Sequence, residues 1–165
     1  MSKIKVQQPI IHTPAFKVWE TPRSCVDQII RNLGLDPLYT NGVHKSYFYT
    51  DNEGRAQLLP HLIQKSSLYK PSAFTCIQYA FKVWTLCGEI YGLNTWVPII
   101  GRIPNYETGK HAWTLIMVGD KDGLKPGEFN YFEPNEGWEM GETLELVYQS
   151  FPIGAEGYTG ELIFY

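Results

Sequence analysis

The sequence predicts an α+β fold, and two observations carry this prediction. A run of apolar residues at three- and four-residue steps over about 73–91 is typical of a helix with one buried face. Three segments rich in β-branched and aromatic residues follow it, at 95–103, 112–118 and 129–133, and each reads as a strand. The chain has 165 residues, close to the roughly 150 of an average domain, so we expect one domain over 1–165.

A shorter helix is expected near the N-terminus. Thr21 supplies a cap, Pro22 is suited to the first turn, and Gly34 is typical of a helix end. Four apolar residues between these signals fall on one face. They are Val26, Ile29, Ile30 and Leu33. This helix should therefore bury one side.

A β-hairpin is expected after that helix. Residues 43–50 alternate loosely and are rich in aromatic and β-branched types, and residues 51–54 are typical of a turn. Residues 55–59 would then form the second strand. Residues 58–67 are expected to be a short helix or irregular, because Pro60 interrupts a weak pattern.

The long helix should carry one cysteine at its start. Pro71 precedes the apolar pattern and Gly92 ends it, which places Cys76 in the first turn. Cys87 lies 11 residues later, so at 1.5 Å per residue about 16 Å separates the two sulfurs, too far for a disulfide. Together with Cys25 they form an odd and sparse set that does not suit a disulfide framework.

The C-terminal part is expected to complete the sheet. Residues 119–127 are rich in glycine and aspartate, which implies an antiparallel hairpin between the second and third strand segments. Residues 142–151 should form a short helix, with Glu142 and Glu145 near its positive end. The final segment, 158–165, reads as a strand.

Composition excludes several classes of protein. Hydrophobic residues make up 44% and charged residues 19%, which favours a packed core over disorder. A net charge of −3 gives no strong attraction to phosphate backbones, so nucleic acid is not an expected partner. No segment is long and apolar enough for a membrane span, and the first residues lack the apolar core of a signal peptide, so we expect a cytoplasmic protein without a membrane partner. Neither cysteines nor histidines have metal-binding spacing, so we expect no structural zinc and no cofactor.

The predicted hairpin brings a histidine and a glutamate together. His111 lies 11 residues before Asp122, and Glu133 lies 11 residues after it. A regular hairpin centred near Asp122 would place both side chains on neighbouring strands at its open end, although a bulge could shift the register. A carboxylate beside an imidazole fixes its tautomer and favours its cationic form.

Cys76 is the better candidate for a reactive thiol. The positive end of the helix dipole favours a thiolate in the first turn, more so with a histidinium nearby. Cys87 in mid-helix has no such support and reads as a core residue. A lone cysteine in a helix is usually a small core hydrophobe, so the case for Cys76 depends on the other residues.

The order of these motifs resembles a known family. Cys76 at a helix start is followed by Tyr79-Ala80, then by His111-Ala112-Trp113, then by a strand ending in Glu133-Pro134. This pattern resembles the core of the transglutaminase-like superfamily over about residues 70–140. The resemblance implies a papain-like α+β fold, in which a Cys-bearing helix packs on an antiparallel β-sheet.

The resemblance also implies roles for three residues. Cys76 would be the nucleophile, His111 the base and acid, and Glu133 the orienting acid. The family mostly has Asp where this chain has Glu133, and the extra methylene changes the reach of the carboxylate. The implied activity is that of a cysteine-dependent amide hydrolase, a peptidase or amidase that acts on a peptide or protein through a thioacyl-enzyme intermediate. Residues 1–69 lie outside the resemblance and are interpreted as a helical and hairpin extension.

Four further residues are candidates for substrate binding. Trp96 and Trp113 flank the site in sequence order and would wall a cleft. Tyr69 or Gln64 would supply a second oxyanion donor beside the backbone N–H of Cys76.

Three other interpretations remain open at this stage. An amine acceptor in place of water would make the protein a transglutaminase-type acyltransferase. An inactive module of the same fold could bind a peptide or glycan in its aromatic cleft. A structural protein would keep Cys76 as a core residue. The sequence specifies no oligomeric state.

Overall fold

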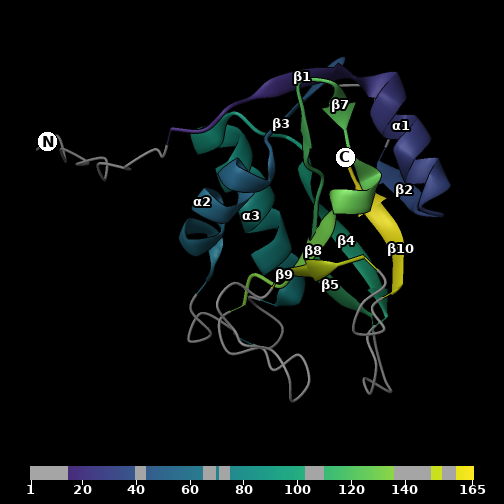
Figure 1. The fold of residues 1–165 in the computed structure, drawn as a ribbon. Helices are drawn as coiled ribbons and strands as arrows, with labels where there is room; N and C mark the ends of the chain where they lie inside the picture. The colour runs from purple at the N-terminus through teal and green to yellow at the C-terminus, as the bar shows by residue number, and fades with distance from the viewer. Residues whose placement is uncertain are drawn as a thin grey trace, which may run out of the picture.

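The chain folds as a mixed α+β structure, which confirms the predicted class (Figure 1). The structure is a computed structural model, and it describes residues 15–39, 44–64, 70, 75–102, 110–135, 150–153 and 159–165. The helices of the described residues are α1 (Arg23–Asn32), α2 (Asn52–Leu62), α3 (Cys76–Tyr91) and the short 3-10 helix η2 (Pro126–Glu128). The strands are β1 (Trp19–Pro22), β2 (Asp36–Tyr39), β3 (Ser46–Tyr49), β4 (Trp96–Arg102), β5 (His111–Ile116), β6 (Gly119–Asp120), β7 (Gly123–Leu124), β8 (Asn130–Phe132), β9 (Ser150–Pro152) and β10 (Thr159–Phe164).

The central sheet has six strands in the order β2-β10-β4-β5-β8-β9. All neighbours pair antiparallel except β2 and β10, which pair parallel. Two smaller sheets join β1 to β3 and β6 to β7. Helix α3 packs against β4 and β5, whereas α1 contacts β1, β2 and β3, and Figure 1 shows these two helices on opposite sides of the sheet. The middle of the sheet is therefore covered by the cysteine-bearing helix.

Helix α1 confirms the first predicted helix with a small shift at its start. Pro22 occupies the cap position in an extended conformation, and Thr21 belongs to β1 instead of capping the helix. Gly34 follows the last turn with φ of +69°, a left-handed conformation that glycine adopts at little cost. Val26 and Ile30 are fully or almost fully buried. The predicted apolar face is thus the face that packs.

The predicted hairpin over 43–59 is wrong. Residues 52–62 form helix α2, and β3 pairs with the unpredicted strand β1. The side chain of Asp51 accepts a hydrogen bond from the N–H of Gly54 at 2.8 Å, so the residues expected to make a turn begin a helix. Pro60 lies inside the last turn of α2, where it cannot donate a hydrogen bond to the carbonyl four residues earlier.

Helix α3 confirms the predicted long helix but is described from Cys76 onward. Residues 71–74 lie outside the described part of the chain, and Thr75 is the cap residue. Gly92 ends the helix with φ of +68°, as expected from the sequence. The three strand segments after it correspond to β4, β5 and β8 with boundaries shifted by one or two residues.

The C-terminal predictions have mixed outcomes. The strand at 158–165 is confirmed as β10. The predicted helix over 142–151 lies outside the described residues up to 149, and its last two residues belong instead to strand β9, which pairs with β8. No local pattern marks β2, a short strand that contains Pro37 and pairs with β10 from the far end of the chain.

The hydrophobic core is one continuous cluster that draws on the whole described chain. Residues before the long helix contribute to it, among them Val26 in α1, Leu58 and Leu62 in α2 and Leu35 before β2. These N-terminal elements therefore support the same core as α3 and the central strands. Among the described residues, no helix combines the length and apolar character that a membrane crossing needs.

Candidate active site

Cys76 stands at the first position of α3. The side-chain oxygen of Gln78 accepts hydrogen bonds from the Thr75 N–H at 2.8 Å and from its hydroxyl at 2.6 Å, which fixes the first turn. The thiol is partly exposed, hydrogen-bonded to the His111 side chain, and in contact with a backbone N–H from Ala112 in β5. A sulfur at this place feels the positive end of the helix dipole.

His111 begins β5 and is almost completely buried, with 3% of its surface exposed. Its Nε2 lies 2.6 Å from Oε2 of Glu133, which leaves Nδ1 as the ring nitrogen available to the thiol. Lys110, just before it, forms a partly exposed ion pair with Glu161 of β10 at 2.7 Å, across the intervening strand β4. The imidazole is thus fixed between a thiol and a carboxylate.

Glu133 follows the last residue of β8 and is fully buried. The β5–β8 ladder pairs Thr114 with Phe132, so continuing it would set Trp113, not His111, opposite Glu133. The register is two places from the one expected for a regular hairpin, because η2 and the small β6–β7 hairpin lie asymmetrically between the strands. The strands are nevertheless antiparallel neighbours as predicted, and the glutamate side chain still reaches the imidazole.

The pKa values of the three groups favour a charged pair. Burial acts to lower the pKa of His111, but hydrogen bonds with Cys76 and Glu133, and the charges of both, raise it to about 9. Burial acts to raise the pKa of Cys76, but the hydrogen bond and charge of His111 and the N–H of Ala112 bring it below its ordinary value. Burial raises the pKa of Glu133, against hydrogen bonds from His111 and Asn135. The lowered pKa of Cys76 and the raised pKa of His111 both favour a thiolate–imidazolium pair over a neutral thiol and imidazole.

The other two cysteines have different environments. Cys87 is fully buried in mid-helix, and burial raises the pKa of its thiol well above the ordinary value. Cys25 is exposed on α1. All three cysteines are free thiols, which agrees with the expectation that Cys76 and Cys87 do not form a disulfide. Only Cys76 combines partial exposure with a histidine partner among them.

The predicted substrate-binding residues lie in several places. Trp96 and Trp113 are fully buried members of the core, and direct contact with a substrate would require part of this packing to open. Trp113 packs instead on His111, with ring centroids 6.1 Å apart. Gln64 is close to the site, but its side-chain nitrogen donates to the Leu62 carbonyl at 2.8 Å. Tyr69 lies outside the described residues.

Several contributing residues were not singled out from the sequence. Thr75 and Gln78 have the Thr-x-x-Gln spacing of a capping box, so this signal was present in the sequence. Ala112 acts through its backbone, and Asn135 binds Glu133 through its backbone N–H at 3.3 Å. Backbone donors leave no signal in residue type.

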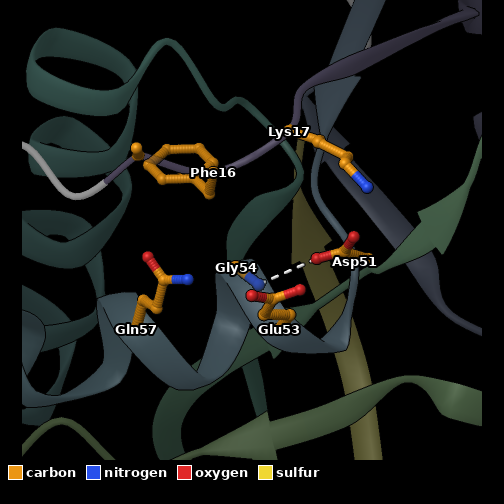
Figure 2. Close-up of a pocket in the computed structure, with 7 residues that line it drawn as sticks. Phe16, Lys17, Asp51, Glu53, Gly54 and Gln57 are labelled. Carbon is orange, nitrogen blue, oxygen red and sulfur yellow. Dashed lines mark hydrogen bonds between the residues drawn. The ribbon is translucent and has the colours of Figure 1, made fainter.

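Two surface pockets lie away from Cys76, His111 and Glu133. One, of about 260 Å³, is at the start of α2 and is lined by Phe16, Lys17 and Glu53 among others (Figure 2). Another, of about 390 Å³, lies beside β7 and includes Cys25. Neither includes any member of the Cys76 site.

The geometry at Cys76 is suited to nucleophilic chemistry. A thiolate can attack an acyl carbonyl, and an imidazolium can then protonate the leaving group. The N–H groups of Cys76 and Ile77, in the first turn of α3, have no acceptor within the helix and could bind an oxyanion. The N–H of Gln78, by contrast, is bound by the Thr75 side chain. Among the described residues, no three His, Cys, Asp or Glu side chains are grouped so as to hold a metal ion.

No protein-family model matches this chain, and no curated protein is significantly similar to it. The chemistry of the site is therefore the basis on which a function can be assigned.

Proposed function

We propose that this protein is a cysteine-dependent amide hydrolase that works through a thioacyl-enzyme intermediate, in a papain-like arrangement related to the transglutaminase-like superfamily. One observation carries the proposal. The partly exposed Cys76 thiol is hydrogen-bonded to His111, and His111 Nε2 lies 2.6 Å from the buried carboxylate of Glu133.

Each side chain has a defined step in the proposed reaction. The Cys76 thiolate attacks the substrate carbonyl while the first N–H groups of α3 stabilise the oxyanion. The carbon–nitrogen bond breaks, and the His111 imidazolium gives its proton to the leaving amine. Neutral His111 then takes a proton from water, which attacks the thioester; the carbon–sulfur bond breaks, the acid is released, and the Cys76 thiolate and His111 imidazolium are restored. Glu133 holds the imidazole orientation throughout and stabilises its charged form.

Acyl transfer to an amine is the second candidate for the same site. It shares every step up to the thioester, and an amine then replaces water as the attacking group. The two reactions differ only in the acceptor, so one experiment can separate them.

The test uses an activated ester and the full chain. We expect p-nitrophenyl acetate to release a burst of p-nitrophenol, with an acetyl group found on Cys76 by peptide mass spectrometry. The Cys76→Ala variant should lose the burst, whereas the matched control Cys25→Ser, which removes an exposed thiol elsewhere, should keep it. Absence of faster acetylation at Cys76 than at Cys25 would contradict the proposal and favour a binding module.

The acceptor and the amide substrate are tested next. Decay of the acetyl-enzyme in water alone supports hydrolysis, and decay that accelerates with added primary amine and yields the acetylated amine supports acyl transfer. A mixture of peptidyl-aminocoumarin amides then tests amide cleavage directly. Fluorescence release that depends on Cys76 is expected for a peptidase or amidase.

A further inference from the structure

The carboxylate of Glu133 must be held in place by something other than the β-ladder. The last pair that the structure gives for β5 and β8 is Thr114 with Phe132. Glu133 comes one residue after β8, beyond this pair, yet its Oε2 approaches His111 Nε2 to 2.6 Å. A side chain beyond the end of a strand needs another constraint to keep such a contact.

The constraint comes from the segment that follows α2. The backbone N–H of Gln64 donates to the carbonyl of Pro134 at 2.6 Å, and Gln64 forms a parallel β-bridge with Asn135. The N–H of Asn135 in turn donates to Oε1 of Glu133 at 3.3 Å. One carboxylate oxygen is thus bound to Asn135 and the other to His111.

Gln64 is itself fixed to the core. It is 6% exposed, and its side chain bonds to the carbonyl of Leu62, the last residue of α2. Leu62 and Leu58 are fully buried in the hydrophobic cluster. The end of α2 is therefore a rigid support against which the 133–135 segment is held.

We infer that Gln64 is a positioning residue, whose backbone N–H fixes the 133–135 segment so that Glu133 can bind His111. The catalytic role of Gln64 rests on the proposed function. The contacts of Gln64 with Pro134 and Asn135 do not, because they are observed in the structure itself. These contacts give α2, outside the region of family resemblance, a part in the site.

A proline substitution tests the backbone bond. Gln64→Pro removes the N–H that binds Pro134, and the preceding Ile63 already has φ of −66° and ψ of +130°, values that suit a residue before proline. Gln64→Ala is the matched control, because it removes the side chain and keeps the N–H. Glu133→Gln serves as the reference for loss of the carboxylate charge.

The readout is the NMR titration of the His111 imidazole, assigned by comparison with His111→Gln. We expect the His111 pKa to fall by about one unit or more in Gln64→Pro, toward the value in Glu133→Gln. Gln64→Ala keeps the N–H and loses only the side-chain bond to Leu62, so it should lower the His111 pKa less than Gln64→Pro does. A folded Gln64→Pro variant with a wild-type His111 titration would overturn the inference.

Two further measurements keep the test decisive. If Gln64→Pro does not fold, Gln64→Gly retains the N–H but loosens the segment, and we expect faster amide exchange at residue 64 together with a lowered His111 pKa. Faster exchange with an unchanged titration would count against the positioning role. Acetylation of wild-type Cys76, measured in parallel, tests the proposed function separately, because the imidazole titration does not depend on turnover.

Discussion

At the scale of residues, the site depends on charges held away from water. His111 is 3% exposed and Glu133 is fully buried, so water solvates neither charge well. Each charge is instead compensated by the other. Removing one partner of such a pair leaves the other uncompensated, which makes each substitution strongly perturbing. The thiol of Cys76 differs because it is partly exposed and can meet a reagent.

We expect Cys76 to be alkylated at lower pH than the other cysteines. Its pKa is lowered by the hydrogen bond and charge of His111 and by the N–H of Ala112, so iodoacetamide should label Cys76 from a lower pH than an ordinary thiol. His111→Ala removes the imidazolium and should move the onset of labelling upward, toward the ordinary thiol range near about pH 8.5. Peptide mass spectrometry after timed labelling measures both rates. Labelling of wild-type Cys76 only above that range would exclude a thiolate–imidazolium pair.

The residues of the site were accessible to sequence reasoning to different degrees. Cys76, His111 and Glu133 could be predicted because each is a reactive type at a recognisable spacing, and the structure brings them together. Gln64 was weighed only as a side-chain donor, whereas its backbone N–H makes the contact to Pro134. Backbone contacts between distant segments depend on tertiary packing and leave no trace in local sequence.

At the scale of elements, capping residues explain both the correct and the wrong predictions. Asp51 and the residues after it have the same chemistry in a turn and at a helix start, and only the burial of Leu58 and Leu62 against the core decides for α2. Helix α3 was less ambiguous because its apolar pattern is long and ends at Gly92. The short strands β1 and β2 are specified by their partners, not by their own residues.

Two glycines should respond oppositely to alanine. Gly101 pairs with His111 in the sheet, and a Cβ there would lie 2.1 Å from the Thr159 carbonyl oxygen and 2.8 Å from the Trp113 ring. Backbone must shift to admit it, so Gly101→Ala should cost about 1–3 kcal/mol. Gly88 is exposed on α3 with nothing nearer than 3.9 Å to such a Cβ, so Gly88→Ala should stabilise by about 1 kcal/mol.

Urea unfolding followed by circular dichroism measures both changes against the wild type. Because the two substitutions add the same methyl group, the difference between them reports the close approach of β10 to β4 at Gly101. Equal effects would mean that this approach is not maintained in solution.

At the scale of the whole molecule, one core includes residues that the sequence analysis interpreted as an N-terminal extension. The first strand-forming and helical residues were interpreted as an extension, yet β2 forms an edge of the six-stranded sheet and α2 contributes Leu58 and Leu62 to the core. The α+β class could be predicted from composition and periodicity, since those are local properties. The strand order could not, because β2 pairs with β10 across more than a hundred residues.

The stability of the whole molecule should depend on the proton shared by His111 and Glu133. The folded-state pKa of His111 is about 9, against about 6.5 in an unfolded chain. In the folded protein the His111–Glu133 pair keeps this proton, on one side chain or the other, up to about pH 9. The unfolded chain releases it above about pH 6.5. Its stabilising contribution is therefore complete below that pH and is lost as the pH rises toward about 9. The lowered pKa of Cys76 has the opposite effect on stability, because it makes the folded state more stable as the pH rises. The measurement should therefore be made in the Cys76→Ala variant, which lacks this contribution.

In that background, we expect the free energy of unfolding to fall between about pH 6.5 and 9 relative to a reference that also carries His111→Gln and Glu133→Gln. The shift sets an upper limit of about 3 kcal/mol, at about 1.4 kcal/mol for each pKa unit. The true change should be smaller, because part of the shift comes from the hydrogen bond with Cys76 that this variant lacks. Urea titrations at several pH values measure both proteins, and subtracting the reference removes groups that titrate in both, including the buried tyrosines. A difference that stays constant over this range would mean that the folded pair holds no additional proton, and the imidazolium on which the proposed chemistry depends would not form.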